Sequence, residues 1–409
     1  MPRAAEAVTE RTSVSSVELF FDLVYVFAIN HVATVVASKA EIGVVRGGLI
    51  LALMWWVWVG YAWLGNQVLV DQRFMQVTML GAVVILFLAG AAIPEAFVDR
   101  PGGLSGPLVL VGCYLAARAV HAVALWHGSG REVRWRRLLE VTVPATIASA
   151  LLVCAVLVPQ RVFDDRLKVA GAQDGLWLLA IVVEYGAGVV VMPGWPVRSA
   201  TLWSERYQLI VIVALGEAFL GLGLGGIEVP LSTALVVVSV LGIVIIAALW
   251  WAYFEVLVPA GERALRRSSG TARTALARDA YSLLHLPILA GIVLFALGLE
   301  KTLSTTEHLK GNGTRTALDH VSLGGLYGGV VLFLLGVLGY QRRVMGEVSR
   351  LRVGAAVLLA ALAPTGTLVP ALAAVGILAA VAVALVAVEF KPHTALHREL
   401  RDSLMTDEH

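Results

Sequence analysis

Long apolar runs alternate with short polar segments along the chain, and the runs have the length of membrane-spanning helices. About 20 apolar residues in an α-helix cross the hydrocarbon core of a bilayer. The first half of the chain contains six such runs, at residues 17–38, 47–64, 76–97, 104–126, 138–158 and 176–192. The second half contains four, at residues 207–224, 233–258, 281–299 and 321–340, followed by a longer run at residues 353–390.

The longer run exceeds one membrane crossing. As a single helix it would extend about 57 Å, nearly twice the roughly 30 Å core of a bilayer. Pro364, Gly366 and Pro370 lie in its middle, and proline and glycine interrupt helices. We therefore expect a hairpin here. The whole pattern predicts an all-α polytopic membrane protein of about 12 transmembrane helices.

Composition agrees with a membrane protein and excludes other classes. Hydrophobic residues make up 58% of the 409 residues, charged residues make up 15%, and the mean hydropathy is +0.82. A soluble core could not cover so much apolar surface. The net charge of +2 comes from short, separate basic clusters, so we expect no nucleic acid as a partner. The sequence contains no phosphate loop, nucleophile elbow or metal-ligand spacing, and we expect no cofactor and no metal.

Positively charged residues indicate the orientation of the helices. Most of the 31 Lys and Arg residues fall in the N-terminal segment, in every second loop after it and in the C-terminal tail. Such segments face the cytoplasm in helical membrane proteins. We therefore expect residues 1–16 and 391–409 in the cytoplasm. The excess of Arg over Lys and the richness in Ala, Val and Gly indicate a GC-rich bacterium, hence a multi-pass protein of the bacterial plasma (inner) membrane.

The two halves of the chain repeat one another. SVELFFDLVYVFAINHV, which begins at Ser16, returns in altered form as WSERYQLIVIVALGEAF, which begins at Trp203. Further along, Glu95 closes the third run and Glu300 closes the ninth. Six spans separate matching helices, so we expect two parallel-oriented six-helix repeats, residues 17–192 and 207–390, joined by a cytoplasmic linker at residues 193–206. Transporters built this way hold their sites between the repeats.

Four segments resemble successive signatures of the low temperature requirement A (LtrA) family of bacterial membrane proteins. They are ELFFDLVYVFAI from Glu18, ERYQLIVIVALGEA from Glu205, WWAYFE from Trp250 and HLPILAGIVLFALGLE from His285. The resemblance extends from about residue 15 to about residue 343. Both the motifs and their order along the chain are specific to the family. It implies a bacterial membrane protein whose family name refers to growth in the cold, and it implies no particular molecular activity.

The first predicted span carries a row of polar side chains. Glu18 and Asp22 are four residues apart near its cytoplasmic end, which places them on one helix face, and Asn30 follows about two turns later. Side-chain oxygen atoms in a row along one helix could bind a cation in steps, so this pattern is compatible with a cation pathway. The alternative for Glu18 is that it only stabilises the first helical turn, where the helix dipole favours a carboxylate.

Glu217 is the strongest single candidate, because it lies near the centre of its span with no basic residue in the same run. An isolated carboxylate among apolar side chains favours its protonated form, which suits a proton relay or an ion-coupling site. Glu184, in the middle of the sixth span, is interpreted in the same way. The alternative is a neutral acid that joins two helices by hydrogen bonds. Arg118 is the one basic residue expected inside a span, and we expect it to pair with Asp22, Glu217 or Glu95.

Other candidates lie at the ends of the spans. Glu205 and Arg206 precede the seventh span and suit a cytoplasmic network, either structural or gating. Glu95 and Glu300 suit an acidic outer vestibule for cations, or two solvated acids. His285 is a single histidine without ligand spacing, which is compatible with a hydrogen-bonded core position or with pH sensing.

These patterns predict a transporter or channel for a small solute or ion, coupled to protons through buried carboxylates between the two repeats. One alternative is a non-transporting scaffold or sensor linked to cold stress. Another is an intramembrane enzyme that acts on lipid, although the sequence favours no enzymatic activity. The expected partners are the lipid bilayer and an unidentified small solute or ion, and the pattern is compatible with a homo-oligomer.

Overall fold

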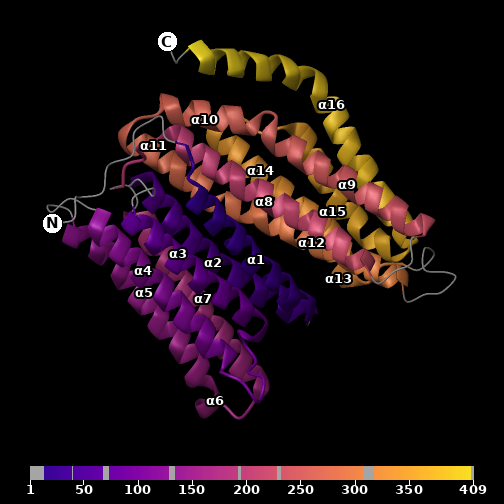
Figure 1. Cartoon of the computed structure of the whole chain (residues 1–409). Helices are drawn as coiled ribbons and strands as arrows, with labels where there is room; N and C mark the ends of the chain where they lie inside the picture. Colours follow the sequence, from indigo (N-terminus) through magenta and orange to yellow (C-terminus); the bar gives the residue numbers. More distant parts are fainter. Residues whose placement is uncertain are drawn as a thin grey trace. The chain divides into compact units, whose positions relative to one another are not determined.

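A computed structural model describes residues 13–38, 40–67, 73–128, 134–191, 195–227, 232–307 and 317–406. These residues form helices almost throughout, and within them extended pairing is limited to one isolated bridge between Ala317 and Pro370. Helices satisfy their own backbone hydrogen bonds, which is the condition for crossing lipid. The prediction of an all-α polytopic protein is therefore confirmed at the level of the fold class (Figure 1).

The chain divides into two compact units. Unit 1 comprises residues 1–206 and 270–275, and unit 2 comprises residues 207–269 and 276–409. The division falls inside one helix, because α8 runs from Ala200 to Ile227.

Unit 1 is a bundle of long helices in which α2 is the most deeply buried. Apart from the start of α8 and most of α11 (Gly270–Leu276), its elements are α1 (Ser16–Ser38), α2 (Ala40–Gln67), α3 (Arg73–Ala92), η1 (Ile93–Glu95), α4 (Gly106–Gly128), α5 (Arg134–Leu157), α6 (Pro159–Val162) and α7 (Arg166–Val191). Helix α1 packs on α2 and α3, α3 on α4, α4 on α5, and α5 on α7. Helix α2 also packs on α4 and α7, and its tryptophans Trp55 and Trp58 are fully buried.

Unit 2 is a second helical bundle. It contains the rest of α8, α9 (Thr233–Phe254), α10 (Leu257–Arg267), the π-helix η3 (Ala277–Leu283), α12 (His285–Glu307), α13 (His320–Leu323), the π-helix η5 (Gly324–Gly328), α14 (Gly329–Met345), α15 (Arg350–Leu362), the 3-10 helix η6 (Ala363–Thr367) and α16 (Ala371–Thr406). Helix α12 packs on α14, α14 on α15, α15 on α16, and α9 on α16.

Eleven helical segments of the described residues are long and apolar enough to span a bilayer, against twelve predicted. The difference arises in the last apolar run. It forms the expected hairpin, with η6 at the proline- and glycine-containing turn, but α15 has 13 residues and extends only about 20 Å, less than the thickness of the hydrocarbon core.

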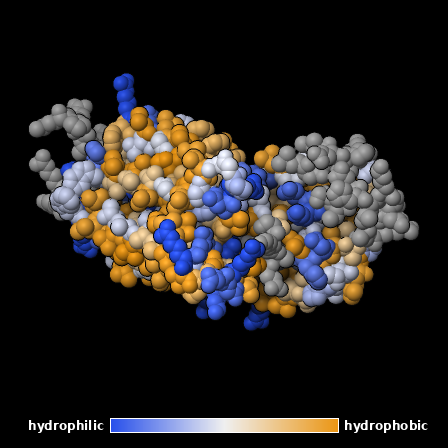
Figure 2. Space-filling view, turned by 90° about the horizontal axis from the view of Figure 1, so that it is seen from below, coloured by the Kyte–Doolittle hydropathy of each residue, from blue (hydrophilic) through white to orange (hydrophobic). Residues whose placement is uncertain are grey.

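One side of α3 is buried and the opposite side is apolar and exposed. Met75, Met79 and Leu86 are buried on one side. The opposite side exposes a stripe of large apolar residues, Phe74, Val77, Leu80, Val84 and Phe87. Exposed apolar residues at this helical spacing match a hydrocarbon environment. Apolar residues likewise cover broad areas of the face shown in Figure 2.

Helices α12 and α14 approach backbone to backbone through glycines. A Cβ atom on Gly329 would lie 2.8 Å from the carbonyl oxygen of Gly291. Small residues are what allow such close packing of membrane helices. The neighbouring Gly328 has no atom within 4 Å of the corresponding position.

We expect Gly329→Ala to lower the free energy of unfolding by about 1–3 kcal/mol, because the added methyl group forces two backbones apart. Gly328→Ala, its matched control, should change stability by less than about 1 kcal/mol, and in the stabilising direction. Denaturation of the purified protein in mixed micelles measures both. Equal effects of the two substitutions would contradict the proposed packing contact.

Candidate functional site

The N-terminus of α1 is closed by a reciprocal cap. The hydroxyl of Ser15 accepts a hydrogen bond from the backbone N–H of Glu18 at 3.4 Å, and the Glu18 carboxylate accepts from the backbone N–H of Ser15 at 3.1 Å. This Ser-x-x-Glu arrangement is a capping box. The structure thus agrees with the alternative in which Glu18 stabilises the first helical turn, although the same carboxylate also has a second partner.

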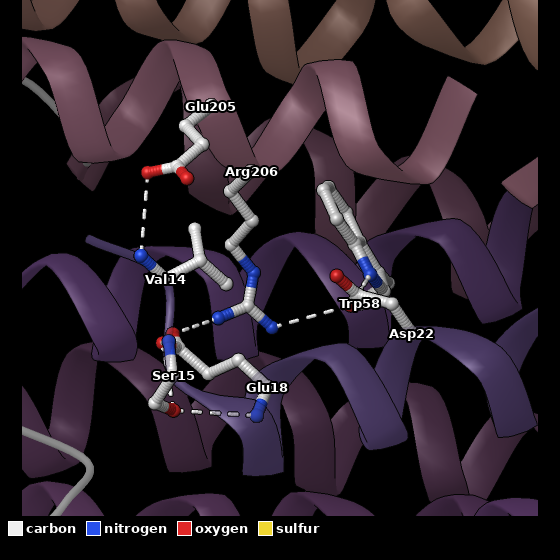
Figure 3. Close-up of polar contacts among 7 residues, drawn as sticks. All are labelled: Val14, Ser15, Glu18, Asp22, Trp58, Glu205 and Arg206. Carbon is white, nitrogen blue, oxygen red and sulfur yellow. Dashed lines mark hydrogen bonds and ion pairs between the residues drawn. The ribbon is translucent and has the colours of Figure 1, made fainter. Parts of the chain in front are cut away.

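Arg206 of α8 is that second partner, and it binds two acids of α1 (Figure 3). One terminal nitrogen of its guanidinium donates to Glu18 Oε1, and the other lies 3.4 Å from Asp22 Oδ1. Glu18, Asp22 and Arg206 are at most 3% exposed. The sequence placed the two acids on one helix face, and the tertiary structure adds the arginine that holds them together.

Asp22 is anchored from a second direction by Trp58 of α2. The indole Nε1–H donates to Asp22 Oδ1 at 2.7 Å, whereas Asp22 Oδ2 is buried without a hydrogen-bond partner among the described residues. The Arg206 guanidinium also lies 5.6 Å from the Trp58 ring and 5.9 Å from the Phe21 ring, within cation–π range. One positive charge therefore faces two buried carboxylates, next to the aromatic rings of Trp58 and Phe21.

Gly65 of α2 makes room for this ion pair. A Cβ atom at this position would lie 3.0 Å from Arg206 Nη1 and closer still to Glu18 Oε1. Next to Arg206 in the chain, the Glu205 carboxylate accepts a hydrogen bond from the backbone N–H of Val14 at 3.2 Å. We name the set Glu18, Asp22, Trp58 and Arg206 the Arg206 network.

A second buried ion pair joins α4 and α7. Arg118 Nη2 donates to Glu184 Oε2 at 3.0 Å, and the hydroxyl of Tyr114 donates to Glu184 Oε1. The side chains of Arg118 and Glu184 are 7% and 1% exposed. Both carboxylate oxygens of Glu184 are thus engaged by donors from α4.

A cavity of about 60 Å³ borders this ion pair. Helices α2, α4, α5 and α7 and Trp195 line it, all within unit 1. Its polar lining includes Arg118, Glu184 and His121, and its walls include Trp56 and Gly60. One water needs roughly 10–15 Å³, so the cavity has room for a few waters or one small molecule.

Unit 2 contains a third buried pair and a histidine enclosed by tyrosines. Arg352 of α15 donates to both carboxylate oxygens of Glu389 of α16, at 2.8 and 3.0 Å. His285 Nδ1 lies 3.0 Å from the carbonyl oxygen of Ala280, which only accepts, so this nitrogen carries the proton; Nε2 lies 2.7 Å from the Tyr253 hydroxyl. Four tyrosine rings surround the imidazole, those of Tyr207, Tyr253, Tyr281 and Tyr340.

Two predictions about basic residues are wrong. Arg118 pairs with Glu184, not with Asp22, Glu217 or Glu95. It is also not the only arginine inside a span, because α8 begins at Ala200 and so includes Arg206, which was expected in a linker. A helix predicted from an apolar run ends at the first charged residue. A membrane helix can nevertheless include an arginine if its guanidinium is paired with a carboxylate.

The remaining predicted residues are less deeply buried than the acids of these clusters. Asn30 on α1 is half-buried. Glu95 in η1 is half-buried and lies 3.8 Å from the exposed Arg100. In unit 2, Glu217 on α8 and Glu300 on α12 are half-buried.

Sequence reasoning missed Trp58 and Tyr114 as partners of the buried acids, and it missed the Arg352–Glu389 pair. One signal was available for that pair. Glu389 follows Glu184 by 205 residues, and Glu300 follows Glu95 by the same number.

Comparison with known proteins decides the family. Residues 13–387 match the model of the bacterial low temperature requirement A protein (LtrA). The chain belongs to the LtrA family. It is also 29% identical over 360 residues to a Rhizobium meliloti (strain 1021) protein described as uncharacterized protein RA0937, a match that covers 83% of this chain and 80% of the relative. No solved structure matches it.

Family membership confirms the resemblance seen in the four sequence segments. Together with the apolar helices, it identifies an LtrA-family protein that crosses a membrane several times. All four residues of the Arg206 network lie within the matched residues 13–387.

Proposed function

We propose that this LtrA-family protein is a membrane transporter or channel for a small solute or ion, coupled to protons. The observation that supports this most is the charge count of the Arg206 network. One guanidinium faces two carboxylates that are buried in membrane-spanning helices. A net negative charge buried in this way is expensive, and binding of a proton removes it.

Asp22 is the residue at which we propose that the proton binds. Glu18 has donors at both oxygens, from Arg206 and from Ser15. Asp22 Oδ2 is buried and has no donor among the described residues, so a proton there removes no existing hydrogen bond. Buried acids in membrane helices often belong to proton pathways.

The two-repeat architecture is part of this proposal. The neighbour order α3, α4, α5, α7 in unit 1 corresponds to α12, α14, α15, α16 in unit 2. The equal sequence offset supports equivalent positions for Glu184 and Glu389, each of which binds a buried arginine. Cytoplasmic termini fit the distribution of Lys and Arg, a bacterial plasma membrane location fits the composition and the family, and parallel duplication fits the sequence repeat.

We expect Asp22→Asn to reduce proton-coupled flux at least tenfold while the protein remains folded, because asparagine keeps the shape and cannot exchange a proton. Proteoliposomes with an internal pH dye and an imposed K⁺ diffusion potential measure this flux. Asp174→Asn is the matched control, because Asp174 pairs with Arg46 in a partly exposed position, at 2.8 Å. Unchanged flux in Asp22→Asn would exclude the coupling role.

Glu217→Gln provides a second test of the same proposal in unit 2. Glu217 is half-buried within a membrane-spanning helix. If its carboxylate takes part in coupling, the neutral amide should also lower the flux. Flux that persists in both amide variants would contradict proton coupling through buried carboxylates.

A scaffold or sensor is the second candidate function. It is favoured by the observation that the buried arginines Arg118, Arg206 and Arg352 each bind a carboxylate, as helix-joining clamps would. A scaffold should keep its cellular role when these acids are neutralised, with only its stability changed. Complementation of a cold-sensitive deletion strain by Asp22→Asn distinguishes the two candidates.

A further inference from the structure

The cavity beside Arg118 contains polar atoms without partners. Arg118 Nε is buried and has no hydrogen-bond partner among the described residues, and the buried His121 ring has only a weak contact with the backbone of Gly60. His121 is 3% exposed, and both residues line the cavity. Buried polar groups are nearly always paired, so the unpaired Arg118 Nε and an unpaired ring nitrogen of His121 beside one cavity point to a bound molecule.

The acids of the cavity are, by contrast, already engaged. Glu184 accepts from Tyr114 and Arg118. Glu140 accepts from Arg136 at 2.8 Å and from the indole N–H of Trp195 at 3.0 Å. What the cavity offers a ligand is therefore a donor at Arg118 Nε and an acceptor at the His121 ring nitrogen that does not contact Gly60.

We propose that this cavity binds a small carboxylic acid together with its proton, held by Arg118 and His121. One carboxyl oxygen accepts from Arg118 Nε–H and the other shares its proton with His121. The charge of Arg118 is balanced by Glu184, so a carboxylate needs a proton on His121 to keep the site neutral. A carboxylate between guanidinium and imidazolium gains two charge-assisted hydrogen bonds, which a neutral amide does not.

The cavity also limits the size of the acid. A volume of about 60 Å³ has room for an acid of the size of formate or acetate. The apolar walls, including Trp56, Val59 and Ala187, suit a methyl group. Ligands of so few atoms bind with dissociation constants in the millimolar to high micromolar range.

Binding of acetate to the purified full-length protein in detergent tests the proposal, by calorimetry and by thermal unfolding. We expect acetate to bind with a roughly millimolar dissociation constant and to raise Tm, and acetamide to bind at least tenfold more weakly. The ionisable groups near His121 are Tyr61 of α2, whose ring centre is 5.3 Å from that of the imidazole, and Arg118, Glu140 and Glu184, which line the same cavity. Because one proton enters with each anion, acetate affinity should increase about tenfold per unit decrease in pH around neutrality.

Two variants locate the site. His121→Phe removes the imidazole, and Gly60→Ala adds a methyl group 3.3 Å from Arg118 Nη1 and 3.5 Å from His121 Cε1. Each should weaken acetate binding at least tenfold. The matched controls are His127→Phe, an exposed histidine of the same helix, and Gly112→Ala, which has open space around it. Both controls should bind acetate as the unmodified protein does.

Three results would overturn the inference. The first is the absence of acetate binding at about 50 mM, a concentration well above the expected dissociation constant. The second is equal binding of acetate and acetamide. The third is unchanged acetate binding in either site variant. The first two need no variant and therefore decide the question even if His121→Phe fails to fold. The readout is binding in detergent, so the inference stands or falls independently of the proposed transport.

Discussion

Arg206→Met is expected to lower the free energy of unfolding by about 3–5 kcal/mol. The substitution removes the positive charge that Glu18 and Asp22 share and leaves both carboxylates buried without it. Methionine has a similar volume, so the loss arises from charge and hydrogen bonding and not from an empty space. Denaturation in mixed micelles, followed by tryptophan fluorescence or circular dichroism, measures the effect.

Arg136→Met is the matched control for this prediction. Arg136 also binds a carboxylate, that of Glu140, but its side chain is 77% exposed, so the substitution should cost at most about 0.5 kcal/mol. Adding Glu18→Gln and Asp22→Asn to Arg206→Met should recover part of the loss, because no buried charge then remains. Equal effects of Arg206→Met and Arg136→Met would show that the network does not stabilise the fold.

Arg118→Met is expected to have an effect of similar size, about 3–5 kcal/mol, because it leaves Glu184 charged and buried in the centre of unit 1. The double variant Arg118→Met, Glu184→Met should return to within about 1–2 kcal/mol of the unmodified protein, since replacing a whole buried pair by apolar side chains is often nearly neutral. The same denaturation experiment measures both variants and gives the coupling energy of the pair.

The double variant also separates a structural role from a functional one. If Arg118 and Glu184 only join α4 to α7, recovered stability should restore the cellular role of the protein. If they form part of a binding site, the double variant should be stable and still fail to bind acetate. A double variant as unstable as Arg118→Met alone would contradict the interpretation that the loss comes from an unpaired buried charge.

The sequence predicted the helices well because lipid imposes a simple rule on them. A segment that crosses hydrocarbon must be apolar over about 20 residues, and this pattern is visible without any tertiary information. The last run illustrates both the strength and the limit of the rule. Pro364 and Gly366 correctly indicated the hairpin. Because the turn takes up part of the apolar run, α15 is too short to cross the hydrocarbon core of a bilayer.

The candidate site was predictable only in part. Glu18, Asp22, Arg118, Glu184 and Arg206 were identified individually, because charged residues are rare inside apolar helices and therefore conspicuous. Their partners were not identified correctly. Arg118 lies 66 residues from Glu184, and Arg206 lies 188 residues from Glu18, and nothing local in the chain relates such positions.

The sequence by itself thus determined the membrane class, the positions of the helices and which side chains carry unusual charge in apolar surroundings. The resemblance to the LtrA family was visible in four short sequence segments that occur in the family's order. Only the tertiary structure decided that Arg206 holds two acids, that Glu184 belongs to Arg118, and that His121 faces a cavity. The physical reason is that hydropathy is a property of each residue and its neighbours in the chain, whereas pairing of buried charges depends on which helices pack together.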